Sequence, residues 1–352
     1  MKQQIIRCTN IEKDLAQFIS DLSYDGLFLL TDENTHKLCL PLIESVPEIR
    51  TAKQIIIPAG DENKNIRSLS MVWEFLSQNG ANRKSLLINL GGGMLTDLGG
   101  FAAATFKRGI RFINIPTTLL GAVDAAVGGK TGINFKGLKN EIGAFAPALA
   151  VLIDSNFFKT LDATNLLSGY AEMLKHALLN SEQELNEILR FDLENPDYQK
   201  LNSLLFESVL VKERIVTKDP TEQGIRKALN LGHTFGHAFE SFSYEIKRPV
   251  PHGYAVAWGT VCELYLSLVK LGFDKDDWMK VARFVKAHYG VFAFDCTHYQ
   301  RLYELMQHDK KNETTTINFS LLKKIGEIEI NQTANQQEID ETLDFFREYF
   351  GL

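Results

Sequence analysis

The sequence has few cysteines, and they are not arranged in pairs. The four cysteines are scattered at Cys8, Cys39, Cys262 and Cys296, and no two of them form a Cys-x-x-Cys motif. This pattern argues against a disulfide framework and against a zinc ribbon. It is typical of reduced thiols in a cytoplasmic protein.

Long apolar runs and an excess of positive charge are also missing. The N-terminus lacks the apolar run of a signal peptide, and the weakly polar stretch at 86–106 is interrupted by Asp97 and five glycines. The net charge of −6 argues against a general nucleic-acid binder but allows a local basic pocket for an anionic small molecule. With 352 residues, the chain is long enough for two domains. We expect a soluble cytoplasmic protein.

Short apolar runs alternate with helical patterns in the first half of the chain. The runs lie at 27–31, 54–57, 86–90, 112–115 and 149–153. Near-continuous apolar runs of this length are typical of buried parallel strands. The pattern predicts a doubly wound, Rossmann-like α/β domain with a mostly parallel sheet, which binds ligands at the carboxyl ends of its strands.

Helical periodicity dominates the second half. Helices are predicted at 161–179, 181–191, 199–218, 227–244, 252–271 and 276–289. We therefore predict an α/β domain at 1–155 and an all-α domain at 156–352. A small hairpin is predicted from Thr314–Thr316 and Ile328–Asn331.

A glycine-rich turn follows the strand at 86–90. Gly91–Gly93 would let the backbone approach a pyrophosphate, whose charge a helix N-terminus favours. The Gly-x-Gly-x-x-Gly fingerprint is not met, because its sixth position is Thr96, so the stretch fits a simple strand–helix turn equally well. Asp32 and Asn34, after an earlier strand, fit ribose binding and a polar strand end equally well.

A second glycine-rich stretch resembles the end of a P-loop. Gly128–Thr131 reads Gly-Gly-Lys-Thr, but Asp124 stands where a P-loop needs its first glycine, so we reject that interpretation. What remains is a loop that presents Lys130, Lys139 and Asn140. Such a loop suits a phosphate monoester, and a solvated lysine loop is the alternative.

Two histidines share a helical spacing. His233 and His237 are four residues apart, so a helix would place both on one face. They could share a metal ion, divide metal and ligand binding between them, or be ordinary interior histidines. Glu172 and Lys175 also share a helix face, a spacing usual for a surface salt bridge. A glutamate with two or three histidines, including His252, would suit a catalytic zinc with an open position.

Four sequence blocks together resemble a known family. They read GGGMLTDLGGFAAATFKRGIRFINIPTTLL, VDAAVGGKTGINFKGLKNEIGAF, GYAEMLKHAL and LNLGHTFGHAFE, in this order. The chain is similar to the 3-dehydroquinate synthase family of the sugar-phosphate cyclases from about residue 25 to 309–311. Glycerol dehydrogenase-like proteins share the fold of this family but not these blocks.

The resemblance implies a metal- and NAD-dependent enzyme of the shikimate pathway, with its active site in the cleft between the two domains. It would convert 3-deoxy-D-arabino-heptulosonate 7-phosphate into 3-dehydroquinate and phosphate. Transient oxidation at C5 acidifies the C6 proton, phosphate leaves by β-elimination, the hydride returns, and an intramolecular aldol step closes the ring. The family is generally homodimeric.

The resemblance also implies roles for individual residues. The metal, zinc or cobalt, would bind Glu172, His233 and His252. The NAD contacts would be Asp32, Asn34, Asp61, Lys64, Gly92, Gly93, Thr96, Asp97, Thr117, Thr118, Lys130, Lys139 and Thr160. The substrate contacts would be Asp124, Lys130, Asn140, Lys175, Lys212, Arg226, Asn230, His237 and Lys310. Arg108 would reach the substrate phosphate from the neighbouring subunit.

Three positions depart from the pattern of the family. Tyr254 stands where a glutamate commonly follows the third metal ligand, Asp61 replaces a glutamate, and Pro220 replaces an acid. None removes a metal ligand or a phosphate contact. The alternatives are a cyclase for another sugar phosphate and a metal- and NAD-dependent alcohol dehydrogenase relative. The Lys212 and Arg226 pair favours the first interpretation, because sedoheptulose and glucose phosphates have no carboxylate for it to bind.

Overall fold

The computed structural model describes residues 3–307 and 317–352, so Lys310 and Thr314–Thr316 lie outside the described residues. The chain forms two compact units. The first unit comprises Met1–Asp162 and Asp197–Glu213, and the second comprises Ala163–Pro196 and Arg214–Leu352.

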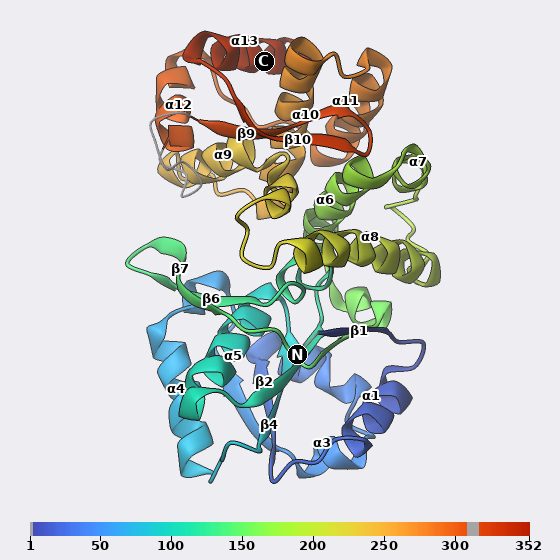
Figure 1. Cartoon of the computed structure of the whole chain (residues 1–352), viewed down its shortest axis with the longest axis vertical. Coiled ribbons are helices and arrows are strands. Elements are labelled where there is room, and N and C mark those ends of the chain that lie inside the picture. Colours follow the sequence, from blue (N-terminus) through green and yellow to red (C-terminus); the bar gives the residue numbers. More distant parts are fainter. Residues whose placement is uncertain (1–2, 308–316) are drawn as a thin grey trace. The chain divides into compact units, whose positions relative to one another are not determined.

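A six-stranded sheet forms the centre of the first unit, and all its strand pairs are parallel (Figure 1). Its strands are β1 (Gln4–Arg7), β2 (Leu27–Asp32), β3 (Lys53–Ile57), β4 (Leu86–Gly91), β5 (Arg111–Pro116) and β8 (Ala150–Ile153). They lie in the order β1-β8-β5-β4-β2-β3. The five predicted strands are confirmed as β2, β3, β4, β5 and β8. The short edge strand β1 has partly exposed residues and therefore lacks an apolar run.

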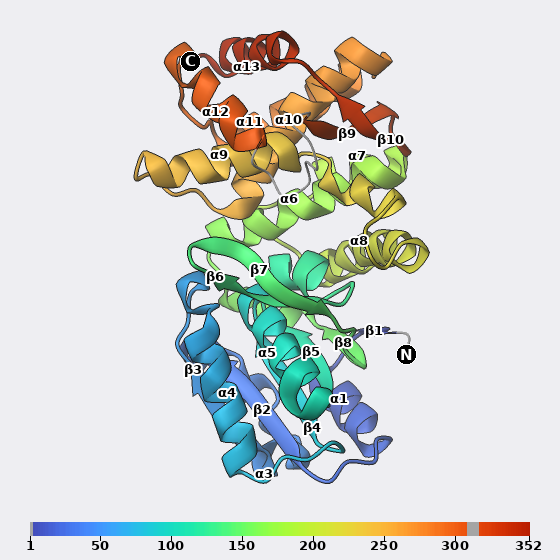
Figure 2. The same cartoon turned by 60° about the vertical axis from the view of Figure 1, so that its left-hand side comes forward.

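Helices cover both faces of this sheet. On one face α4 (Ile66–Gln78) and α5 (Gly93–Thr105) pack over a core that includes Phe28 and Leu30 of β2 (Figure 2). On the other face lie α1 (Ile11–Ser20) and α3 (Pro47–Thr51). All six residues of β2 are buried, because alternate side chains enter the two layers. Because both faces of the strand are buried, apolar residues occupy consecutive positions, and the strands appear in the sequence as continuous apolar runs.

The predicted lysine loop is in fact an antiparallel hairpin. Its strands are β6 (Lys130–Phe135) and β7 (Leu138–Phe145). The turn residues Lys136 and Gly137 both have positive φ, 49° and 82°, which suits a tight two-residue hairpin turn. The glycines of this stretch hide the strand alternation in the sequence. The hairpin is separate from the parallel sheet.

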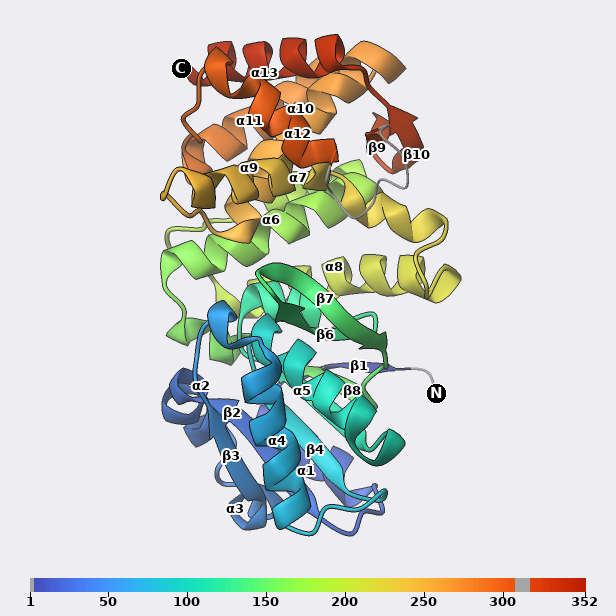
Figure 3. The ribbon, with the colours of Figure 1, turned by 90° about the vertical axis from the view of Figure 1, so that its left-hand side faces the viewer.

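The second unit is mostly helical. Its helices are α6 (Ala163–Asn180), α7 (Glu182–Leu189), α9 (His233–Glu245), α10 (His252–Leu271), α11 (Lys275–Tyr289), α12 (Tyr299–Gln307) and α13 (Gln336–Phe350). Helix α8 (Tyr198–Lys218) contributes residues to both units. The antiparallel strands β9 (Asn318–Lys324) and β10 (Glu327–Thr333) lie beside these helices (Figure 3). The fold class is confirmed, but this hairpin makes the second unit mostly helical rather than all-α.

One predicted helix start is wrong. Periodicity predicted a helix at 227–244, but the chain forms a 3₁₀ turn at Ile225–Asn230 and begins α9 only at His233. Gly232 separates the two with φ of +80°, a left-handed conformation that a helix cannot contain. Among the described helices, none has the length and apolar character needed to span a lipid bilayer.

Candidate active site

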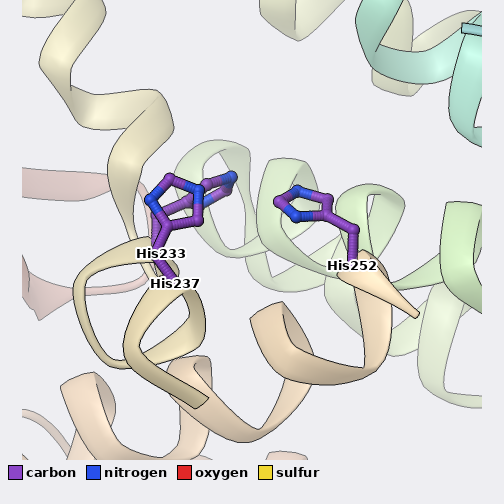
Figure 4. Close-up of side chains that lie close together, drawn as sticks. All are labelled: His233, His237 and His252. Atoms are coloured by element: carbon purple, nitrogen blue, oxygen red, sulfur yellow. The ribbon is translucent and has the colours of Figure 1, made fainter. Parts of the chain in front are cut away.

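Three helices of the second unit bring one carboxylate and three imidazoles together. Glu172 lies within α6, His233 and His237 lie on α9, and His252 is the first residue of α10. Glu172 Oε1 is 3.5 Å from Nε2 of His233 and 3.7 Å from Nε2 of His252. Figure 4 shows the His252 ring across from the other two, and one ring nitrogen of each lies within 4.8 Å of the others.

These spacings fit a bound divalent cation. Ligand atoms held about 2.0 to 2.2 Å from a tetrahedral ion lie roughly 3.3 to 3.6 Å from one another. The separations from Glu172 Oε1 to the two imidazole nitrogens are close to this range and are long for hydrogen bonds. Glu172 Oε2 pairs with the Lys175 ammonium, whereas buried Oε1 has no hydrogen-bond partner among the described residues. The donor set therefore fits zinc or cobalt, with His237 near enough to be an alternative ligand.

The outer nitrogens of the two imidazoles are already engaged. His233 Nδ1 lies 3.1 Å from the carbonyl oxygen of Leu231, and His252 Nδ1 lies 2.9 Å from Glu240 Oε2. Because a carbonyl oxygen and a carboxylate accept hydrogen bonds, both contacts place the ring proton on Nδ1. When such a ring is neutral, this tautomer presents the lone pair of Nε2 to a cation.

Tyr254 packs against two aromatic side chains. Its ring lies edge-on to Tyr289 and Trp258, with centroid separations of 5.0 and 6.0 Å. The family commonly has a glutamate at this position. The carboxylates that lie near His252 in this chain are those of Glu240, at Nδ1, and Glu172, at Nε2.

Electrostatics keep Glu172 ionised. Burial alone would raise the pKa of Glu172, but the Lys175 ammonium and the nearby His233 imidazole outweigh it and lower that pKa well below its usual range. Glu172 and Lys175 form an ion pair, and their side chains are only 0% and 1% exposed. The pair is therefore buried, not the surface salt bridge that the spacing alone would suggest.

His252 is shifted in the opposite direction. Burial acts to lower the pKa of His252, but the neighbouring carboxylates of Glu172 and Glu240 raise it to about 10. In the metal-free protein this imidazole holds a proton at neutral pH, and a cation would have to displace that proton.

A capped loop holds two predicted substrate residues. The Asp219 carboxylate accepts hydrogen bonds from the backbone N–H groups of Gln223, Gly224 and Arg226. Buried Arg226 donates from Nη1 to the carbonyl oxygen of Pro220 at 2.6 Å. Pro220 therefore still helps to orient the guanidinium through its backbone. Nearby, Asn230 Nδ2 donates to Glu222 Oε1 at 3.4 Å.

The glycine turn of the first unit forms a cradle at the carboxyl ends of β4 and β5. Gly91 pairs with Pro116, which brings the turn beside Thr117 and Thr118. A Cβ on Gly92 would lie 3.0 Å from Thr118 Cγ2, and a Cβ on Gly93 would lie 2.9 Å from Ala125 Cβ. No side chain of the described residues caps α5, so its N-terminus can receive an anion. The geometry fits a dinucleotide pyrophosphate.

Thr96 has a different environment from these glycines. Its hydroxyl donates to the carbonyl oxygen of Gly93 at 3.1 Å, and its side chain is buried within the turn. This contact stabilises the first turn of α5. Thr96 therefore supports the shape of the cradle.

One lysine joins two predicted sites of the first unit. Lys64 Nζ donates to Asp97 Oδ2 at 2.6 Å and also to Asn140 Oδ1. Burial raises the pKa of the Asp97 carboxyl, although the Lys64 ammonium opposes the rise. Asp97 and Lys64 were predicted to bind NAD, and Asn140 was predicted to bind substrate. The structure places all three in one cluster.

Exposed contacts lie beside this cluster. Lys139 Nζ is 3.9 Å from Asp61 Oδ2, and Asn134 Nδ2 donates to the same oxygen at 3.3 Å. The short side chain of Asp61 is therefore tied to the β6–β7 hairpin. Asn134 also accepts a hydrogen bond from the backbone N–H of Asn140 at 2.9 Å.

Lys212 and Asp124, both predicted substrate residues, form another pair. Lys212 Nζ lies 2.5 Å from Asp124 Oδ1 and 2.5 Å from the Asp124 carbonyl oxygen. The lysine comes from α8 and the aspartate from the turn Gly121–Ala125. The Lys212 ammonium is therefore held in place before any substrate binds.

The other predicted residues lie at the ends of elements. Asp32 caps the short helix α2 (Glu33–Leu38) by accepting from the backbone N–H groups of Asn34 and Thr35. Thr160 ends the turn Ser155–Thr160, and Lys130 begins β6. Arg108 follows α5 with φ of +68°. The ligand-binding roles of these residues stay predictions.

Glu240 and Glu263 were missed by the sequence analysis. Glu240 contacts His252, and Glu263 contacts the backbone at the start of α9. Their spacings from the histidines, seven residues after His233 and eleven after His252, only place each glutamate on its own helix. The partner of each lies on the other helix, so no sequence period reveals the contact.

Solved structures of other proteins share the fold of this chain. A 2-deoxy-scyllo-inosose synthase, solved with carbaglucose-6-phosphate, NAD⁺ and Co²⁺, has a TM-score of 0.83 at 20% identity, covering 98% of this chain and 96% of that chain. The 2-epi-5-epi-valiolone synthase of Streptomyces hygroscopicus subsp. jinggangensis, solved with NAD⁺ and Zn²⁺, has a TM-score of 0.84 at 22% identity, covering 99% and 97%. The chain therefore has the same fold as these two synthases.

Sequence comparisons narrow the assignment. Residues 54–168 match the family model described as 3-dehydroquinate synthase N-terminal, and residues 169–312 match the one described as 3-dehydroquinate synthase C-terminal. The 3-dehydroquinate synthase of Parabacteroides distasonis is 55% identical over 351 residues, covering 100% of this chain and 99% of the relative. The chain belongs to the 3-dehydroquinate synthase family.

Proposed function

We propose that the chain converts 3-deoxy-D-arabino-heptulosonate 7-phosphate into 3-dehydroquinate and phosphate. The observation that carries this proposal is the buried Glu172 carboxylate facing Nε2 of His233 and His252, in a chain of this family. A bound NAD supplies a hydride acceptor and donor, and a bound zinc or cobalt ion supplies a Lewis acid for the substrate hydroxyls.

Glu172, His233 and His252 hold the metal in this proposal. The spacing of their donor atoms and the Nδ1 contacts of both imidazoles support this choice. His237, one helical turn after His233, then faces the substrate. Its ring centroid lies 5.3 Å from that of His233, close enough to contact the same bound molecule.

Cationic residues bind the two anionic groups of the substrate. Lys130, Asn140 and Lys175 hold the phosphate, and Lys212 with Arg226 binds the carboxylate. Arg226 is buried, and its hydrogen bond to the Pro220 carbonyl oxygen holds the guanidinium in one orientation. Less side-chain conformational entropy is therefore lost when the guanidinium makes a bidentate contact with the carboxylate. The phosphate can itself accept the C6 proton when it leaves.

The glycine cradle and its neighbours bind NAD. The open N-terminus of α5 at Gly92 and Gly93 receives the pyrophosphate, supported by Thr96 and flanked by Thr117 and Thr118. The remaining NAD contacts of the proposal are Asp32, Asn34, Asp61, Lys64, Asp97, Lys130, Lys139 and Thr160. Lys310, the other proposed substrate residue, lies outside the described residues.

Three further features belong to the proposal. The enzyme is a cytoplasmic homodimer in which Arg108 reaches the substrate phosphate bound to the partner. The NAD-binding part corresponds to residues 1–155, and the helical part, with the metal ligands, corresponds to 156–352. The reaction uses residues of both parts, because Asp124 and Lys130 serve the same substrate as Lys175 and Arg226.

The test is an incubation of the purified protein with NAD, a divalent metal and the heptulosonate phosphate. We expect inorganic phosphate and 3-dehydroquinate to form in equal amounts without accumulation of NADH. Sedoheptulose 7-phosphate, which has no carboxylate for Lys212 and Arg226, should not react. Cyclisation of that sugar would indicate another cyclase, and steady NADH production would indicate a dehydrogenase.

A further inference from the structure

Glu263 is a fully buried carboxylate that faces the start of another helix. It lies on α10 with 0% of its surface exposed. Its Oε2 accepts from the N–H of Gly232 at 2.7 Å, and its Oε1 accepts from the N–H of Thr234 at 2.9 Å and that of Phe235 at 3.4 Å. The first N–H groups of a helix have no partner within that helix, and a negative charge is favourable there. Glu263 therefore fixes the start of α9, whose first residue is His233.

Glu240 makes the reciprocal contact. It lies on α9, is buried, and holds Nδ1 of His252 at 2.9 Å. His252 is the first residue of α10. Each of the two helices thus begins with a proposed metal ligand and carries a carboxylate that contacts the beginning of the other helix.

A close backbone approach makes these contacts possible. A Cβ on Gly259 of α10 would lie 2.1 Å from the carbonyl oxygen of Gly232, and a Cβ on Gly236 of α9 would lie 3.0 Å from that of Ala255. Gly232 itself has φ of +80°, and a Cβ there would lie 2.2 Å from Thr260 Oγ1. Gly232, at the N-cap position of α9, has no side chain that could cap this helix, and the carboxylate of Glu263 on α10 accepts from its first N–H groups instead.

We propose that Glu240 and Glu263 form a reciprocal carboxylate brace that presets Nε2 of His233 and of His252 to receive the same cation. Both are positioning residues, since each acts through a histidine or a helix start. The brace rests on the proposed metal site and goes beyond it, because it explains how two ligands on separate helices keep a fixed separation before the cation binds. Outer contacts of this kind typically contribute about 10- to 100-fold to metal affinity.

The experiment compares Co²⁺ binding by the parent protein and four variants, using competition with a chelator and the visible absorption of bound Co²⁺. We expect E240A to bind Co²⁺ about 10- to 100-fold more weakly, with an altered spectrum. E240Q keeps an oxygen acceptor for the Nδ1–H of His252 and should lose less affinity. E263Q turns an amide NH₂ towards a backbone N–H, so it should weaken binding and change the spectrum.

Glu245→Gln is the matched control. Glu245 lies on the same helix as Glu240, is exposed, and pairs with Arg301 at 2.6 Å, so its variant should bind Co²⁺ as the parent does. If Glu240 and Glu263 had only a structural role, the variants would melt at lower temperature but keep the parent affinity and spectrum when folded. That result overturns the brace. If E263Q does not fold, the Co²⁺ affinities and spectra of E240A and E240Q still test the brace.

The binding assay also separates this inference from the proposed function. Co²⁺ affinity is measured without substrate, so it does not depend on catalysis. A parent protein whose Co²⁺ affinity depends on Glu240 and Glu263, but which releases no phosphate, contradicts the proposed function alone. Variants that bind Co²⁺ as the parent does, in an active enzyme, contradict the brace alone.

Discussion

Glu172 and His252 carry opposite charges in the metal-free protein for one shared reason. Each is desolvated, and each is compensated by an oppositely charged neighbour. The Lys175 ammonium and the imidazoles lower the pKa of Glu172, and the carboxylates of Glu172 and Glu240 raise that of His252. A cation would replace the His252 proton as the partner of these carboxylates. Metal affinity should therefore depend on pH.

The expected result is a continued rise of Co²⁺ affinity with pH. A group with a raised pKa keeps its proton until the pH passes that value, here about 10, and below it the cation competes with the proton. Affinity should rise up to about tenfold per pH unit from roughly pH 7 to pH 9, whereas a histidine with the ordinary pKa of about 6.5 would give a plateau. Co²⁺ titrations at several pH values measure this. A Co²⁺ affinity that stops rising near neutral pH contradicts it.

A variant of the single residue Lys212 tests substrate binding. Asp124 holds its ammonium in place, and we propose that it contacts the substrate carboxylate. A hydrogen bond to a charged group contributes about 1.5 to 3 kcal/mol, so K212M should raise KM for the heptulosonate phosphate by roughly 10- to 100-fold.

The control for Lys212 uses binding that does not involve the carboxylate. K212M should bind NAD and Co²⁺ with the parent affinities, because neither proposed site includes Lys212. Steady-state kinetics of phosphate release give KM and kcat. A normal KM with a reduced kcat would show that Lys212 does not contribute to substrate binding.

At the scale of elements, the contact between α9 and α10 sets the distance between two proposed ligands. Gly259 faces the Gly232 carbonyl so closely that a methyl group would lie 2.1 Å from it. We expect G259A to force the helices apart, at a cost of about 1 to 3 kcal/mol in the free energy of unfolding. It should also weaken Co²⁺ binding. Thermal unfolding and Co²⁺ competition measure the two effects.

Gly272→Ala is the control for this change. Gly272 ends the same helix with φ of +74°, and a methyl group added there would have nothing within 4 Å, so alanine strains the backbone without touching α9. We expect G272A to lower stability but to leave Co²⁺ affinity unchanged. Equal affinities in G259A and G272A would show that the helix separation does not determine metal binding.

The elements also show which parts of the fold a sequence reveals. The strand at 27–31 was predictable because both faces of β2 are buried, which produces a continuous apolar run. The hairpin β6–β7 was not, because its glycines and exposed residues mask the alternation. The start of α9 was placed too early because periodicity does not reveal the left-handed Gly232.

The candidate site was also only partly predictable from the sequence. The spacing of His233 and His237 predicted a shared helix face, which the structure contains. The contacts of Glu240 and Glu263 were not predictable, because each links two helices through tertiary packing. The metal ligands themselves came from the resemblance of the sequence blocks to a family. Their assignment stays a prediction.

At the scale of the whole molecule, the proposed reaction needs groups from both units. The first unit supplies the glycine cradle and the pair of Lys212 with Asp124. The second supplies Glu172 with its histidines and the held guanidinium of Arg226. Neither set alone contains both a dinucleotide cradle and a candidate metal centre. Because the chain belongs to the 3-dehydroquinate synthase family, we propose that metal and NAD serve one reaction.

The decisive measurement is phosphate release from 3-deoxy-D-arabino-heptulosonate 7-phosphate, with NAD present, before and after treatment with a chelator. We predict release with the metal, loss of release with the chelator, and recovery when Zn²⁺ or Co²⁺ is added back. NADH should not accumulate at any stage. Undiminished release by the fully metal-depleted protein would contradict a shared role of metal and NAD.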